Sequence, residues 1–90
     1  MVYYVYLIKT LNNFPKKTYV GYTNDLYKRL IKHNNNKGAK STKGHKWKII
    51  FKKKFISKSL AMSYEYFLKK NRILRKKIIN EKKNSNSITL

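Results

Sequence analysis

Five residues in the N-terminal part of the chain have types and spacings that suit attack on a phosphodiester bond. Tyr19 and Gly21 belong to a short apolar stretch, and a predicted helix follows at once. In that helix Arg29 and His33 lie four residues apart and therefore on one face. An upstream aromatic stretch that contains Tyr6 can pair with the first stretch. A phenol, a guanidinium that can hold two phosphate oxygens and an imidazole would then lie close together.

Each of these side chains also has an ordinary structural interpretation. Tyr6 and Tyr19 are two of eight tyrosines, and either could be a half-buried strand residue. Arg29 could face solvent, but it is one of only three arginines among 23 basic residues, which favours a need for the planar arginine fork. His33 could meet the last carbonyl groups of its helix. For His45, in a lysine-rich loop, a structural role is the preferred interpretation.

Glu65 is one of only three acidic residues in the chain. It lies at the edge of the apolar stripe of a predicted helix, with Ala61 and Leu68 as its neighbours on that face. A carboxylate there is costly unless it is paired or bound to a metal, and Mg²⁺ often takes one carboxylate together with waters and substrate phosphate. A salt bridge to Lys69 at i+4 is the alternative. Asp25 is interpreted as a helix-start residue.

Strand and helix patterns predict the elements that must hold these side chains. The predicted strands span 2–9, 18–22 and 47–56, and the predicted helices begin after Thr23 or Asn24, after Ser57 or Ser59 (to about residue 70) and at residue 72 (to residue 79). The order β-β-α-β-α-α predicts a small α/β sandwich, in which helices pack on a three-stranded sheet with an N-terminal β-hairpin. The place of the third strand in the sheet stays open.

The predicted domain covers residues 1–79, and residues 80–90 are predicted to be a polar, disordered tail. Within the strand at 47–56, Trp47, Ile49, Phe51 and Phe55 fall on alternate positions, with Lys53 as the exception. Residues 11–17 and 34–44 are predicted to be loops, because they contain asparagine, proline or glycine.

The charge balance indicates a polyanionic partner. The chain carries 23 basic and three acidic residues, for a net charge of +20. AT-rich codons could explain part of the lysine excess, but they do not explain why acidic residues are so scarce. Nucleic acid is therefore the expected partner, ahead of membrane surfaces and acidic proteins. No protein partner can be identified from the sequence.

Composition also excludes several classes of protein. With no cysteine, the chain has neither a disulfide scaffold nor a thiolate zinc site. No apolar run reaches the roughly 18 residues of a membrane span, and the N-terminus does not have the pattern of a signal peptide. These features predict an intracellular, cytoplasmic protein.

The loop after the first predicted helix is expected to contact nucleic acid. Its lysines Lys37, Lys40 and Lys43 are predicted to grip the sugar-phosphate backbone, and an ordinary solvated loop is the alternative. Gly21 would permit a close backbone approach beside the site. Asn71 could support the metal or the substrate.

Taken in order, these motifs resemble the GIY-YIG nuclease family, in particular its small single-domain branch. The residues that carry the resemblance are Tyr4-Val5-Tyr6, Tyr19-Val20-Gly21, Thr23-Asn24-Asp25-Leu26, Arg29, His33-Asn34, Gly38-Ala39-Lys40 and Glu65. One departure is that Tyr4 stands where the family name has its first glycine. Because that position is a backbone site in a strand, the change is not expected to remove activity.

The resemblance implies an endonuclease that hydrolyses DNA with one Mg²⁺ ion, in DNA repair or recombination. Mn²⁺ is the alternative metal, and RNA is the other candidate substrate. Tyr6 would be the general base, Tyr19 and His33 supporting groups, Arg29 the electrostatic stabiliser and Glu65 the metal ligand. The positive surroundings are expected to lower the pKa of Tyr6 and favour its phenolate. The alternatives are a catalytically inactive nucleic-acid-binding module with the same fold and a basic protein of the ribosomal or nucleoid type.

Overall fold

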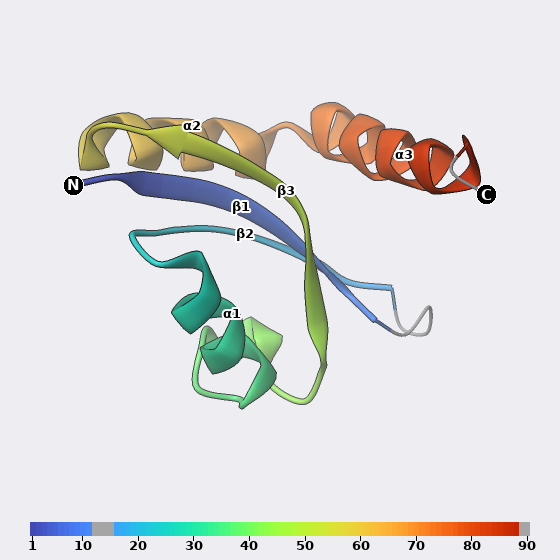
Figure 1. Ribbon diagram of the computed structural model, residues 1–90, viewed down its shortest axis with the longest axis horizontal. Helices are drawn as coiled ribbons and strands as arrows, with labels where there is room; N and C mark the ends of the chain where they lie inside the picture. The colour runs from blue at the N-terminus through green and yellow to red at the C-terminus, as the bar shows by residue number, and fades with distance from the viewer. Residues whose placement is uncertain (12–15, 89–90) are drawn as a thin grey trace.

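The computed structural model describes residues 1–11 and 16–88, and the side chains of residues 82–88 are outside this description. Its elements are β1 (Tyr3–Thr10), β2 (Thr18–Thr23), α1 (Leu26–Asn34), a short 3₁₀ helix η1 (Lys40–Thr42), β3 (Trp47–Phe55), α2 (Lys58–Lys70) and α3 (Arg72–Ile88). This order confirms the α/β fold predicted from the sequence (Figure 1). Part of the loop predicted at 11–17, namely residues 12–15, lies outside the described residues.

The three strands form one antiparallel sheet in the order β2-β1-β3. The third strand therefore pairs with β1, which the sequence left open. In this register Tyr6 lies opposite Gly21 on β2 and opposite Lys52 on β3. Because successive side chains of a strand point to opposite faces, Tyr6 and Ile8 project to one side of the sheet and Val5 and Leu7 to the other.

Each face of the sheet is covered by its own helical layer, with α1 on one side and α2 and α3 on the other (Figure 1). The core between the sheet and α2/α3 consists of Val5, Leu7, Val20, Ala61, Leu68 and Ile78. The core on the α1 side consists of Tyr6, Ile8 and Trp47, and Tyr19, Leu26, Leu30 and Ile49 pack against it. Tyr6, the predicted general base, thus lies on the α1 side of the sheet.

A β-bulge in β3 divides its apolar residues between the two layers. Leu7 pairs with Phe51 and Ile8 pairs with Ile49, so Ile50 is an extra residue on β3. The alternate positions of Trp47, Ile49, Phe51 and Phe55 therefore do not share one face. Trp47 and Ile49 pack on the α1 side, whereas Phe51 and Phe55 pack on the α2/α3 side.

Polar side chains cap the helices: Ser57 caps α2 as predicted, whereas Asp25 caps α1 in place of Thr23 or Asn24. Asp25 accepts a hydrogen bond of 3.1 Å from the backbone N–H of Lys28 at the start of α1, and Ser57 does the same for Leu60 at the start of α2. The Asn71 side chain accepts a hydrogen bond of 3.0 Å from the N–H of Leu74. Asn71 thus has a structural function at the start of α3.

Helix α3 continues to Ile88, past the point at residue 80 where a disordered tail was expected. The sequence from residue 72 onward contains neither glycine nor proline, so nothing in the chain stops the helix at residue 79. Residues 89–90 lie outside the described residues, and the division into a domain and a tail stays a prediction. Within residues 1–11 and 16–88, no helix is both long enough and apolar enough to cross a membrane.

Candidate active site

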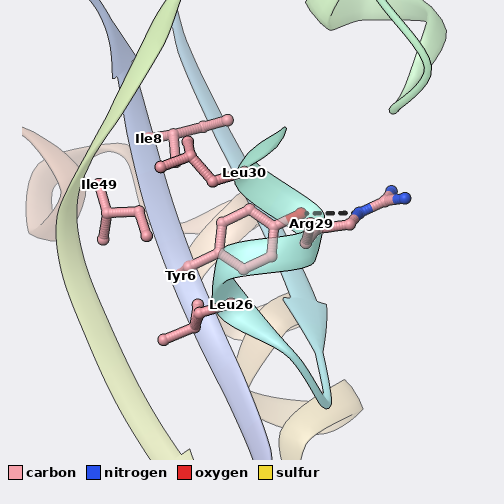
Figure 2. A pocket seen from close by; sticks show the side chains of 6 residues that line it. All are labelled: Tyr6, Ile8, Leu26, Arg29, Leu30 and Ile49. Carbon is pink, nitrogen blue, oxygen red and sulfur yellow. Dashed lines mark hydrogen bonds between the residues drawn. The ribbon is translucent and has the colours of Figure 1, made fainter. Parts of the chain in front are cut away.

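Tyr6 lies at the centre of the candidate active site. Its hydroxyl oxygen Oη is 2.8 Å from Nε2 of His33, and Nε of Arg29 donates a hydrogen bond of 3.2 Å to the same oxygen. Strand β1 supplies the phenol and α1 supplies the other two groups, whose spacing of four residues directs them to the same place. The Tyr6 ring packs among the aliphatic side chains Ile8, Leu26, Leu30 and Ile49 (Figure 2).

Tyr19 from β2 completes the cluster. The centre of its ring is 5.1 Å from that of His33 and 6.4 Å from that of Tyr6. Tyr6 and His33 are buried, whereas Tyr19 and Arg29 are partly exposed. A phosphate that approaches from solvent would therefore meet Arg29 and Tyr19 first, with the Tyr6–His33 pair beneath them. The structure thus brings together the four residues that the sequence placed on the first two strands and the first helix.

Two glycines make room for this cluster. A Cβ atom at Gly21 would overlap with Oη of Tyr6 and lie 2.6 Å from its Cζ, and a Cβ at Gly38 would overlap with Nδ1 of His33. Gly21 was predicted to permit a close approach, and what approaches is the phenol of its partner on β1. In the sequence Gly38 stands out only as part of a motif, and its place beside the imidazole gives that motif a physical reason.

Burial raises the pKa of Tyr6 to about 12, although Arg29 lowers it through its hydrogen bond and its charge. The expectation that positive surroundings would lower this pKa is therefore wrong, because desolvation of the phenolate outweighs the nearby guanidinium. The free protein holds Tyr6 as a neutral phenol at neutral pH. A role for Tyr6 as a base then requires that its own proton leaves as it accepts another.

Burial, together with the charge of Arg29, lowers the pKa of His33 to about 4. The imidazole is consequently neutral at neutral pH and can accept a hydrogen bond at one nitrogen and donate one at the other. Its Nε2 faces Tyr6, and its Nδ1 is 2.9 Å from Oγ1 of Thr42, a fully buried residue. Sequence reasoning missed Thr42, because nothing in the sequence distinguishes it from the exposed Ser41 beside it.

Glu65 comes from α2, in the layer on the opposite side of the sheet. Its side chain is 18% exposed and forms an ion pair with Lys69 at 3.5 Å, which is the interaction that the sequence offered as the alternative to metal binding. Its negative charge contributes to the raised pKa of Tyr6, so it lies within electrostatic reach of the cluster. Among the described residues there is no group of three or more His, Cys, Asp or Glu side chains that could hold a metal. A single carboxylate fits only a hard cation whose other ligands are water and phosphate oxygens.

The three lysines predicted to grip nucleic acid are exposed. Lys37 follows α1, Lys40 begins η1 and Lys43 follows η1. A further lysine, Lys52, lies opposite Tyr6 in the sheet register and therefore on the same face as the cluster, a position that the sequence alone does not reveal. Its exposed side chain adds a further positive charge on that face.

We expect His33 to make the free energy of unfolding depend on pH. The unfolded chain takes up this proton as the pH falls through about 6.5, whereas the folded protein resists it until about 4. As the pH falls from about 6.5 toward 4, the free energy of unfolding should therefore decrease. His33 should account for up to about 3 kcal/mol of this decrease. Urea denaturation at several pH values measures the effect. His33→Gln should remove this part of the pH dependence, and His45→Gln should keep it.

The fold and the Tyr–Arg–His cluster define a small α/β domain of the GIY-YIG type. Residues 2–85 match the GIY-YIG catalytic domain, and the chain belongs to this family. The resemblance noted from the sequence is thereby confirmed. Membership makes nuclease activity on nucleic acid possible, and the family typically depends on a metal ion.

Several of the similar proteins are small and carry UPF0213 names. UPF0213 protein YazA of Bacillus subtilis is 42% identical over 85 residues, which cover 92% of this chain and 83% of that protein. UPF0213 protein OB0043 of Oceanobacillus iheyensis is 43% identical over 68 residues, which cover 74% of this chain and 76% of that one. The solution NMR structure of UPF0213 protein BH0048 from Bacillus halodurans is 33% identical, with a TM-score of 0.53 over 89% of this chain and 84% of that chain.

Proposed function

We propose that this protein is a metal-dependent endonuclease that hydrolyses phosphodiester bonds in DNA. The observation that carries the proposal is the position of Tyr6 Oη between Arg29 Nε and His33 Nε2, at 3.2 and 2.8 Å. A buried phenol between a cation and a neutral imidazole can receive a proton on one side and release one on the other. A purely structural buried tyrosine would need one hydrogen-bond partner for its hydroxyl, but not both a cation and an imidazole.

In the proposed reaction the oxygen of a water molecule forms a bond to phosphorus. The proton of that water passes to Tyr6 Oη while the phenol proton passes to Nε2 of His33, so no free phenolate is formed. This concerted transfer suits a phenol whose pKa is about 12. One P–O ester bond breaks, and its oxygen leaves with the electron pair and takes a proton from solvent. The products are a phosphate monoester and a free hydroxyl.

Arg29 has a second function in this proposal. Its Nε donates to Tyr6, and its side chain is partly exposed beside Tyr19, so the guanidinium can also contact a phosphate. The guanidinium charge would stabilise the negative charge that develops on the phosphate oxygens. Glu65 would hold a Mg²⁺ or Mn²⁺ ion, which supplies Lewis-acid stabilisation of the same charge when it is bound.

The net charge of +20 and the exposed lysines after α1 support binding to the DNA backbone. If about five phosphates are neutralised, log K should fall with log salt at a slope of about −4 to −5. Replacing Lys37, Lys40 and Lys43 with glutamine should flatten the slope by up to ~3, with little change in sequence preference. Fluorescence anisotropy in EDTA measures binding without cleavage.

A matched triple variant controls for the loss of charge alone. Lys58, Lys76 and Lys77 are exposed lysines of α2 and α3, in the other layer of the fold. Their replacement with glutamine removes the same charge and should change the slope much less. Equal slopes for the two triple variants would show that the loop after α1 does not face the DNA.

The direct test of the proposed function is a cleavage assay on linear, nicked, flapped and branched DNA, each with Mg²⁺ and with EDTA. Cleavage of at least one substrate only in the metal buffer is the expected result, and the preferred substrate would connect the enzyme to repair or recombination. An RNA duplex and a single-stranded RNA should be included. Binding to DNA without cleavage in either Mg²⁺ or Mn²⁺ would favour an inactive binding module.

A further inference from the structure

Thr42 lies against the nitrogen of His33 that does not face Tyr6. Its Oγ1 donates a hydrogen bond of 2.8 Å to the carbonyl oxygen of Ala39 and lies 2.9 Å from His33 Nδ1. A threonine hydroxyl has one hydrogen, and a carbonyl oxygen can only accept. Because that hydrogen is committed to Ala39, Thr42 can meet His33 Nδ1 only as an acceptor.

This arrangement fixes the positions of the hydrogens along the cluster. Nδ1 of His33 must carry a hydrogen, and the neutral ring then has a bare Nε2, which accepts from the Tyr6 hydroxyl. Arg29 Nε donates to Tyr6 Oη. The donors thus all point the same way, from Arg29 through Tyr6, His33 and Thr42 to the carbonyl of Ala39.

We propose that Thr42 is a positioning residue that holds His33 in the Nδ1–H form and so directs the Tyr6 proton to Nε2. The proposal rests on the proposed nuclease function. In the other neutral form, His33 Nε2–H would donate to Tyr6 Oη, which already accepts from Arg29. The phenol could then not give its proton to the imidazole, and its oxygen would have no lone pair left for an incoming water.

Thr42 is itself held firmly from its backbone side. Nε1 of Trp47 donates a hydrogen bond of 3.0 Å to the carbonyl oxygen of Thr42. The side chain of Asn34, next to His33 in α1, bonds both the N–H and the C=O of Trp47, at 2.6 and 3.3 Å. The end of α1, η1 and the start of β3 are thereby tied into one unit behind the imidazole.

Among the side chains around His33, Thr42 is the one placed to accept a hydrogen bond from Nδ1. The side chains that face the ring are Tyr6 from β1, Tyr19 from β2, Arg29 from α1 and Thr42 from η1. Of these, Tyr6 meets Nε2 and Thr42 meets Nδ1. Arg29 is a donor only, so it cannot accept from the imidazole.

The experiment compares Thr42→Val, which keeps the shape and removes the hydroxyl, with Thr42→Ser, which keeps the hydroxyl. Cleavage of the preferred DNA should fall roughly 10-fold or more in the valine variant and stay within about threefold of wild type in the serine variant. DNA affinity in EDTA should not change in either. Nitrogen-15 NMR of the imidazole should show a protonated Nδ1 in wild type and Thr42→Ser, and a shift toward Nε2–H in Thr42→Val.

The outcomes separate this proposal from the proposed function. A protonated Nε2 in the wild-type protein at neutral pH would overturn it at once, without any variant. A Thr42→Val variant that keeps the Nδ1–H form, or that cleaves like wild type, would also overturn the proposal. If Thr42→Val does not fold, Thr42→Ala takes its place in the same two measurements. If the wild type cleaves no nucleic acid, the nuclease function fails, and with it the role of Thr42 in catalysis, even where NMR supports the hydrogen-bond direction.

Discussion

Glu65→Gln should abolish DNA cleavage while leaving DNA binding intact or slightly stronger. The change keeps the shape of the side chain but removes the only carboxylate that lies within electrostatic reach of Tyr6 among the described residues. A metal held by one carboxylate, water and phosphate then loses its charged protein ligand. Removal of a negative charge near the substrate phosphate should help binding. Cleavage in Mg²⁺ and anisotropy in EDTA measure the two effects separately.

The fold should survive this substitution, since the only ion pair of Glu65 in the described structure is with Lys69 on the helix surface, at 3.5 Å. Such pairs typically contribute about 0–1 kcal/mol. Glu81→Gln is the matched control, because it removes an exposed acidic residue of α3 and should cleave like wild type. Full Mg²⁺-dependent cleavage by Glu65→Gln would refute the assignment of Glu65 as the metal ligand.

Tyr6→Phe should lower cleavage by about 100-fold or more, which is within the range of general acid–base catalysis. The ring still fills the same space among the aliphatic residues of the α1 layer, but the relay from water to His33 is cut. Loss of the hydroxyl also leaves Arg29 Nε and His33 Nε2 without their partner, at a cost of about 1–3 kcal/mol in stability. Single-turnover cleavage with saturating enzyme measures the chemical effect apart from DNA affinity.

Tyr4→Phe is the control for this variant, because Tyr4 lies two residues away on the same strand and on the same face. It should cleave like wild type. Near-wild-type cleavage by Tyr6→Phe would move the base to Tyr19 or His33. Because the pKa of Tyr6 is about 12, ionisation of this phenol should produce no rise in kcat/KM between about pH 7 and about pH 10.

The sequence was sufficient for the order of strands and helices because each element carries its own pattern. Aromatic and β-branched stretches marked the strands, and Asp25 and Ser57 marked helix starts that the structure confirms by hydrogen bonds. The pairing of β3 with β1 could not be read, since it depends on contacts between distant parts of the chain. The continuation of α3 past residue 79 could not be predicted, because the polar composition that follows is also typical of a disordered tail.

For the candidate site, residue types were easier to predict than environments. The meeting of Tyr6, Arg29 and His33 followed from helix spacing and strand pairing. The pKa of Tyr6 was predicted in the wrong direction, because net charge is visible in a sequence and burial of one hydroxyl is not. Thr42 was missed for the same reason: its importance lies in its distance to an imidazole nitrogen rather than in its neighbours along the chain.

The extra residue at Ile50 has a consequence for how this chain tolerates changes in length. Up to Ile49 the strand packs its apolar side chains on the α1 side, and from Phe51 onward on the other. Because side chains alternate with a period of two, deletion of Ile50 would make Ile49 and Phe51 neighbours on opposite faces, which are the faces that they already occupy. A deletion at Lys52 would instead turn either Phe51 or Phe55 out of the α2/α3 core. A single-residue deletion should therefore be accepted at Ile50 more readily than at the regular positions of this strand.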